Sequence, residues 1–159
     1  MFDFNHYIAN LIRSNRLAVS HGFTPGTCTG IEGIESIIQA WRTTRAFCLT
    51  DDIETGQTLR RGGAFFQRRT LTIFLLMRCH PTNEAERLQA IATCRDLRRQ
   101  LQSRIVADAQ LLQDSLTYID LDQMPTTDLG TFVGSGLTGC YFMINIDEPI
   151  NLTLNPDEW

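Results

Sequence analysis

The chain has 159 residues, of which 43% are hydrophobic and 20% charged, a composition typical of one globular domain with a sizeable core. No stretch approaches the roughly 18 apolar residues of a membrane-spanning helix, and the opening residues, MFDFNHYIANLIRSNR, lack the features of a signal peptide. The formal net charge of −4 argues against a simple nucleic-acid-binding module, because such modules are usually strongly basic.

The charges are unevenly distributed along the chain. Residues 1–104 carry all 14 arginines and 9 acidic residues, a balance of +5, whereas residues 105–159 carry 9 acidic residues and no arginine. There is no lysine, which excludes sites that need a phosphate-binding or Schiff-base lysine. Two interpretations remain open: the two halves meet between molecules, or they neutralise each other within one chain.

The five cysteines show no pattern that indicates a disulfide framework or a metal site. They are odd in number, scattered and without a C-x-x-C motif, so we expect buried, reduced thiols. The pair Cys79-His80 has no second pair to complete a metal site, and we expect no metal and no cofactor.

The first half of the chain predicts two helices and two strands. Apolar spacing indicates helices over 4–17 and 32–41, separated by the glycine-rich segment 22–33, which we expect to be a loop. A strand follows over 44–52, and the alternation from Phe66 to Cys79 predicts another.

The second half predicts one long helix and two strands. The helix over 80–113 has an apolar stripe and an N-terminal cap at Asn83 with Glu86. Strands are expected over 116–124 and 140–149, joined by a long connection. The whole is a single α+β domain, 1–159: an antiparallel sheet of about four strands with a long helix and one or two shorter helices packed on one face. An extended arm or hairpin is expected at about 51–69, and a short C-terminal tail over 149–159.

No catalytic motif is evident. The three histidines are far apart, and Asp120 and Asp122, two residues apart on a predicted strand, lack the further oxygen ligands of a cation site. We therefore expect no enzyme; a small metal-dependent enzyme that uses this aspartate pair and a histidine is the weaker alternative.

The segment RRGGAFFQRR is the most informative motif. Arginine suits bidentate pairing with carboxylates or phosphates, and aromatic side chains stack on bases or fill interface cores. The motif supplies Arg60, Arg61, Phe65, Phe66, Arg68 and Arg69. One hypothesis is pairing with carboxylates of a neighbouring subunit, with Asp120, Asp122, Asp128, Asp147 and Glu148 as acceptors; the alternative is a nucleic-acid-binding accessory protein. Trp159 is expected to anchor the tail to an apolar surface.

Three segments, RRGGAFFQRRTLTIFLLMR, NEAERLQAIATCRDLRRQLQSRI and GLTGCYFMINIDEPINL, together resemble small proteins from tail-gene clusters of Bacteroides-type phages and prophages. The order of elements is similar to that of tail terminator and head–tail joining (neck) proteins. The resemblance implies a non-enzymatic virion protein, made in the host cytoplasm, that forms a ring, commonly a hexamer. Such a ring caps the tail tube, docks it to the neck, and lets DNA pass without specific binding; no membrane partner is implied.

Overall fold

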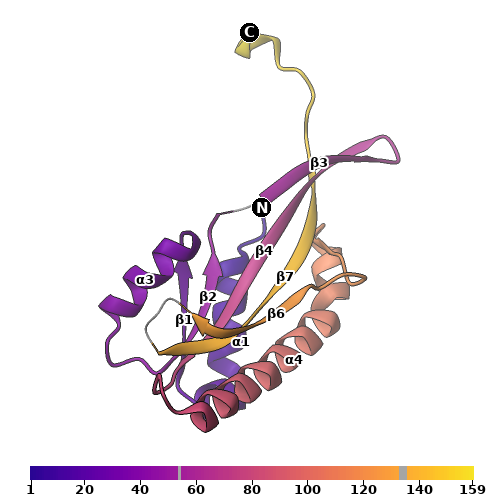
Figure 1. Cartoon of the computed structure of the whole chain (residues 1–159). Helices are drawn as coiled ribbons and strands as arrows, with labels where there is room; N and C mark the ends of the chain where they lie inside the picture. Colours follow the sequence, from indigo (N-terminus) through magenta and orange to yellow (C-terminus); the bar gives the residue numbers. More distant parts are fainter. Residues whose placement is uncertain (54, 133–135) are drawn as a thin grey trace.

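The computed structural model of the protein describes residues 1–53, 55–132 and 136–159 (Figure 1). Residue 54, in the expected arm, and residues 133–135, in the expected connection, lie outside the described residues. The helices are α1 (Phe4–Ser14), α2 (Arg16–Ser20), α3 (Gly30–Ala40), α4 (Glu84–Asp114) and a final 3₁₀ turn, η1 (Pro156–Glu158). The strands are β1 (Phe23–Cys28), β2 (Ala46–Asp51), β3 (Thr55–Arg61), β4 (Ala64–Arg78), β5 (Tyr118–Ile119), β6 (Thr126–Phe132) and β7 (Leu137–Ile150).

The strands form one mixed sheet in the order β1-β2-β4-β7-β5, with β3 paired to β4 and β6 paired to β7. The α+β class is confirmed, but the expected sheet of about four antiparallel strands is wrong in detail. The described sheet has seven strands, and β1 runs parallel to β2. The sequence pattern did not predict β1 and β6. Both are edge strands rich in glycine and threonine, and they lack the hydrophobic alternation of a half-buried strand.

Helices cover both faces of the sheet, not one. Helices α1 and α4 pack on the face that carries Leu71, Ile73 and Leu75 of β4, whereas α3 packs on the opposite face against Phe74 and Leu76. Because successive strand residues point to opposite faces, the apolar run at the end of β4 serves both cores. Figure 1 shows α4 running beneath the sheet and α3 on the other side, beside β1 and β2.

Helix α4 begins as its sequence predicts. The Asn83 side chain accepts a hydrogen bond from the Glu86 backbone N–H at 3.1 Å. The Glu86 carboxylate, however, accepts from the backbone N–H of His80 at 3.1 Å, so the reciprocal bond expected in a capping box goes to a residue further upstream. Among the described residues, no helix has the length and apolar composition needed to cross a lipid bilayer.

The end of α4 is a Schellman motif with an unusual residue at its centre. The backbone N–H of Thr117 donates to the Leu112 carbonyl at 3.0 Å, and that of Leu116 donates to the Gln113 carbonyl at 2.9 Å. Leu116 therefore has a left-handed backbone, with φ of 62°, where glycine is normally found. Its side chain is 56% exposed, so burial does not offset the strain.

Replacing Leu116 with glycine is expected to stabilise the folded chain by about 1 kcal/mol, the cost that a side chain adds to the left-handed conformation. Chemical denaturation followed by circular dichroism measures the change. Leu111→Gly, at an exposed position within α4, is the matched control and is expected to destabilise by about 1 kcal/mol. A Leu116→Gly variant that is clearly less stable than the parent would contradict the assignment of strain.

Strands β3 and β4 form a hairpin closed by two glycines. Gly62 and Gly63 have φ of 55° and 86°, the positive values that a two-residue hairpin turn requires. The distal part of this hairpin projects beyond the helical layers, and the segment that follows β7 leaves the body at the same end (Figure 1). We call residues 60–65 the hairpin tip and residues 151–159 the C-terminal tail.

Candidate assembly surface: the hairpin, the groove and the C-terminal tail

An arginine pair on β4 lies beside an acidic pair on β7. In the antiparallel register Arg68 is directly opposite Asp147, and Arg69 is diagonal to Glu148. Because neighbouring residues of a strand point to opposite faces, the two pairs place one ion pair on each side of the sheet. Both arginines of the Arg68-Arg69 pair therefore have carboxylate partners in their own chain.

On the face opposite α4, Arg68 forms a bidentate ion pair with Asp147, with Nε–Oδ1 and Nη2–Oδ2 distances of 2.7 and 2.9 Å. Arg61 also contacts Asp147, at 2.8 Å, and Asp120 approaches Arg68 at 3.2 Å. The Asp147 residue is only 3% exposed. Hydrogen bonds to the Asp147 carboxylate raise the pKa of Arg68 above its ordinary value.

On the α4 face, Arg69 donates to Glu148 at 2.7 Å and to the backbone carbonyl of Phe2 at 3.0 Å. The backbone N–H of Phe2 in turn donates to the other oxygen of Glu148 at 2.6 Å. Arg69 is 5% exposed, so this ion pair is shielded from water and fixes the N-terminal segment to the sheet.

The acidic half of the sequence meets further arginines on α4. Asp128 of β6 accepts a hydrogen bond from Arg95 at 3.0 Å, and this contact lowers the pKa of Asp128. Asp108 accepts from Arg104 at 2.8 Å and from the Tyr7 hydroxyl at 3.0 Å. These pairs, with those of Arg68 and Arg69, correspond to neutralisation within one chain, the second of the two interpretations that the charge distribution left open.

Asp120, Asp128, Asp147 and Glu148, the expected acceptors for arginines of a neighbouring subunit, each pair with an arginine of their own chain, and their contact with a second copy stays a prediction. Asp120, Asp147 and Glu148 meet Arg68 and Arg69 because β7 pairs with both β4 and β5. Asp128 of β6 instead meets Arg95 and Arg98 of α4. Asp122 forms no ion pair with the residues that the structure describes; its backbone N–H donates to Asp120. Phe66 is also engaged within the chain, edge-to-face with Tyr118 at 5.9 Å.

The hypothesis of a metal site finds no geometry to support it in the described residues. Asp120 and Asp122 follow β5 and do not share a strand face, because the strand ends at Ile119. No group of three His, Cys, Asp or Glu side chains in the described part of the chain is arranged to hold a metal ion. The five cysteines are free and buried, and burial raises the thiol pKa of Cys28 to about 12 and of Cys140 to about 11.

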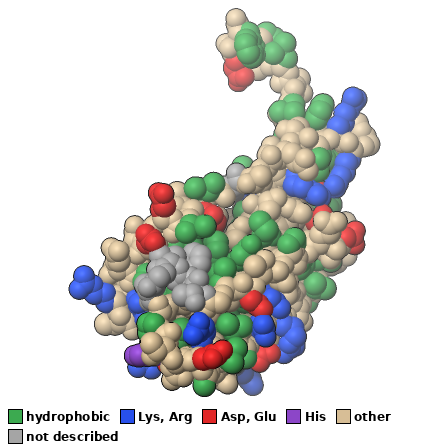
Figure 2. Space-filling model, in the orientation of Figure 1, with side chains coloured by type: hydrophobic (Ala, Val, Ile, Leu, Met, Phe, Trp, Pro, Cys, Tyr) green, Lys and Arg blue, Asp and Glu red, His purple; other side chains and the backbone are tan. Residues whose placement is uncertain are grey.

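The hairpin tip keeps an arginine that is not used internally. Arg60 is exposed and lies over the Phe65 ring at 5.7 Å, and the structure gives it no ion pair among the described residues. Phe65 is opposite Arg60 on β3 and opposite Ile150 on β7. The three residues therefore form a row across the sheet, on the face that α4 covers further along. Figure 2 shows the basic side chains on the projecting hairpin.

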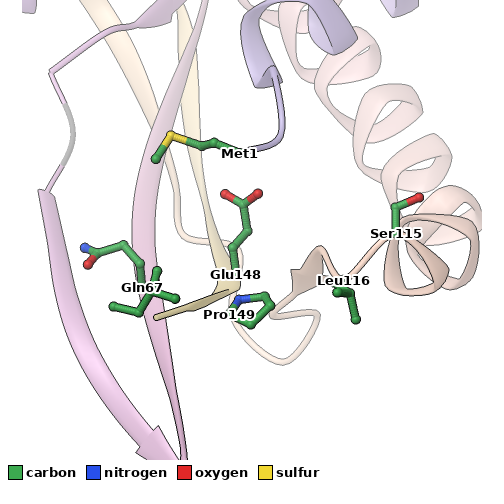
Figure 3. A pocket seen from close by; sticks show the side chains of 7 residues that line it. Met1, Gln67, Ser115, Leu116, Glu148 and Pro149 are labelled. Carbon is green, nitrogen blue, oxygen red and sulfur yellow. The ribbon is translucent and has the colours of Figure 1, made fainter. Parts of the chain in front are cut away.

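A groove of about 370 Å³ lies at the base of this row. Figure 3 shows Glu148 at its centre, Met1 and Gln67 on one side, and Leu116 on the other, where the chain leaves α4. Pro149 and Ile150 complete the wall formed by β7. The negative charge of Glu148 is neutralised by Arg69, and the groove combines the exposed apolar side chains of Met1 and Leu116 with the polar Gln67 and Ser115.

The C-terminal tail begins at this groove and leaves the body. All nine of its residues are exposed, including Leu152, Leu154 and Trp159, which is 96% exposed. Its end is a local turn, in which the Asn155 side chain accepts from the backbone N–H of Asp157 at 3.2 Å. Trp159 therefore has no apolar surface of its own chain to anchor it. Figure 2 shows apolar and acidic side chains gathered at the end of the tail.

No protein-family model and no curated protein matches the chain. Any functional assignment must therefore be argued from the surfaces described above.

Sequence reasoning identified the hairpin and Trp159 but missed the groove. Leu116 carried no sequence signal because its left-handed backbone becomes evident only from the helix end that surrounds it. The tail does carry a sequence signal. The period-two spacing of Ile150, Leu152 and Leu154, at the end of a predicted strand, indicates an extended segment with one apolar side.

Proposed function

We propose that the protein is a structural subunit of a phage tail, a tail terminator or head–tail connector, that assembles with copies of itself into a ring. The observation that best supports self-assembly is that the hairpin and the C-terminal tail both project from one end of the molecule. The tail exposes Leu152, Leu154 and Trp159, and the hairpin tip exposes Arg60 and, beneath it, part of Phe65. Large exposed apolar side chains gathered on one projection are typical of a binding surface.

Ion pairs inside the subunit make the projecting hairpin rigid, as an assembly subunit requires. The internal ion pairs of Arg68 and Arg69 hold β4 and β7 together beyond the end of α4, where the sheet has less apolar cover. The hairpin can then project as a rigid arm. Rigid projecting elements lose little conformational entropy on binding, which favours assembly.

The proposed ring is built from heterologous contacts, in which one surface of a subunit meets a different surface of the next. A closed ring of this kind, proposed to be a hexamer, would cap the tail tube, dock it to the neck and leave a channel for DNA. The nucleic-acid-binding alternative is less favoured, because three of its four arginines, Arg61, Arg68 and Arg69, already pair with carboxylates of the chain.

Native mass measurement of the purified chain over a concentration series, combined with negative-stain imaging, tests the proposal. We expect a discrete closed oligomer with a central opening, because heterologous contacts with the correct rotation close at a fixed number of subunits. A monomer at every concentration would contradict self-assembly. Steeply salt-dependent DNA binding by that monomer would instead support the nucleic-acid-binding alternative.

A further inference from the structure

We infer that the C-terminal tail of one copy binds in the groove beneath the hairpin of a second copy. Leu152, Leu154 and Trp159 supply the apolar contacts, and the acidic end of the tail meets Arg60. The inference rests on the proposed self-assembly and specifies the two surfaces that meet.

The groove is a part of the sheet that the chain's own helices do not reach. Helix α4 ends at Asp114, while β4 and β7 continue to pair as far as Phe65 and Ile150. The face that carries the main core lower down is therefore open at this end, between Leu116 and the hairpin. Leu116 places an apolar side chain in water at a position where glycine would relieve its backbone strain. Residues held in such conformations often belong to binding sites.

The C-terminal tail has a composition suited to cover the end of the sheet that α4 does not reach. Its leucines alternate with polar residues, so an extended tail presents both leucines on one side. The hydrogen bonds of Asn155 with Asp157 and Glu158 form a turn immediately before Trp159. The tail end is thus partly ordered before binding, which lowers the entropic cost of docking. Tryptophan is among the residues that contribute most to binding at interfaces.

The remaining charges are complementary. Asp120, Asp128, Asp147 and Glu148 are engaged with arginines of their own chain. The tail adds Asp157 and Glu158, and the hairpin tip adds Arg60; none of the three forms an ion pair with the described part of its own chain. Arg60 lies in the same row as Ile150, a residue of the groove wall. A tail seated in the groove would bring its acidic end within reach of this arginine.

The geometry favours a second copy over the chain's own groove. The tail is rooted at Ile150, which itself forms part of the groove wall, and from there it extends away from the body (Figure 1). To enter its own groove it would have to reverse direction at its first residue. Each copy offers one tail and one groove, which are different surfaces, so repeated docking generates the heterologous contacts of a ring.

Sedimentation velocity of the full chain, over a range of concentrations, tests the contact with one variant on each side. Trp159→Ala removes the main apolar group of the tail, and Leu116→Gly removes a wall of the groove while relieving backbone strain. We expect each to weaken self-association about tenfold or more. Ile31→Ala, an equally exposed apolar residue on α3, is the control and is expected to associate like the parent. Association unchanged in both test variants would overturn the inference and leave the ring proposal standing.

Mixing the two variants decides between a second copy and the chain's own groove. The Leu116→Gly copy retains an intact tail, and the Trp159→Ala copy retains an intact groove. We expect the mixture to form a heterodimer through one restored junction and nothing larger, because the complementary surfaces are both defective. If each variant is defective alone and mixing restores nothing, the tail does not bind a groove on another copy, and the inference is wrong.

A full chain that is monomeric at all concentrations would contradict the ring proposal but still allow a direct test of the docking site. The probe is a fluorescent peptide with the sequence of residues 150–159, titrated into the Trp159→Ala protein. Binding that is lost on combining Trp159→Ala with Leu116→Gly would support the inference. Absence of binding, or binding equal to that of a peptide with serine at both leucines and the tryptophan, would overturn it.

Discussion

Gly139→Ala is expected to prevent the protein from folding. Gly139 lies in β7 opposite Leu76 of β4, with φ of 154°. A Cβ atom at this position would lie 1.9 Å from the Leu75 carbonyl oxygen and 3.0 Å from the Leu76 Cα, both backbone atoms of the neighbouring strand. Neither can rotate away, so β4 and β7 would have to separate where they form the centre of the sheet. We expect a loss of at least about 4 kcal/mol, in the range reserved for severe core disruption.

Thermal and chemical denaturation followed by circular dichroism measure this effect. Gly130→Ala is the matched control: Gly130 lies in the edge strand β6, and a Cβ there would have no atom within 4 Å. It is expected to change stability by less than about 0.5 kcal/mol, as surface substitutions usually do. A Gly139→Ala protein with the cooperative unfolding and midpoint of the parent would show that β4 and β7 do not approach as described.

Asp147→Asn is expected to destabilise the protein by about 3 kcal/mol, because Asp147 is the buried partner of the ion pair and its loss of charge leaves Arg68 with only part of its charge compensation. Asp147 is bound bidentately by Arg68 and is also contacted by Arg61. Asparagine keeps the size of the side chain but loses its charge and one acceptor oxygen. Arg68 keeps its contact with Asp120, at 3.2 Å, which sets an upper limit on the loss.

Urea denaturation at neutral pH measures the loss, with Asp122→Asn as control. Asp122 is exposed, follows the same short strand β5, and forms no ion pair within the described ranges of the chain, so its substitution is expected to be close to neutral. Equal stability of the two variants would mean that the ion pair holds no part of the fold. Arg68 would then again be a candidate for contact with a second copy of the chain.

These outcomes bear on the function because they separate internal from external arginines. Arg68 and Arg69 stabilise the base of the hairpin, and their loss is expected to appear first as a loss of stability. Arg60 is exposed at the tip and is expected to affect association alone. An assembly experiment on the whole arginine motif, without stability measurements, would confuse the two effects.

The sequence by itself determined the elements whose information is local. The period of the apolar residues defined α4 and β4, and Asn83 marked the start of α4, because capping and amphipathic spacing depend on residues within a few positions of one another. The uneven distribution of charge was also evident from the sequence, which left open whether the two halves meet between molecules or within one chain.

Only the tertiary structure shows which of these charges pair within the chain. Arg68 and Asp147 are 79 residues apart and meet because β4 and β7 pair in one register, which no local pattern specifies. A second pairing between distant segments, of β1 with β2, makes the glycine-rich segment 23–28 a strand. The β4–β7 pairing continues past the end of α4 and leaves that end of the sheet uncovered by the helix. Partners of a side chain depend on which distant strands become neighbours, and that is a property of the whole fold.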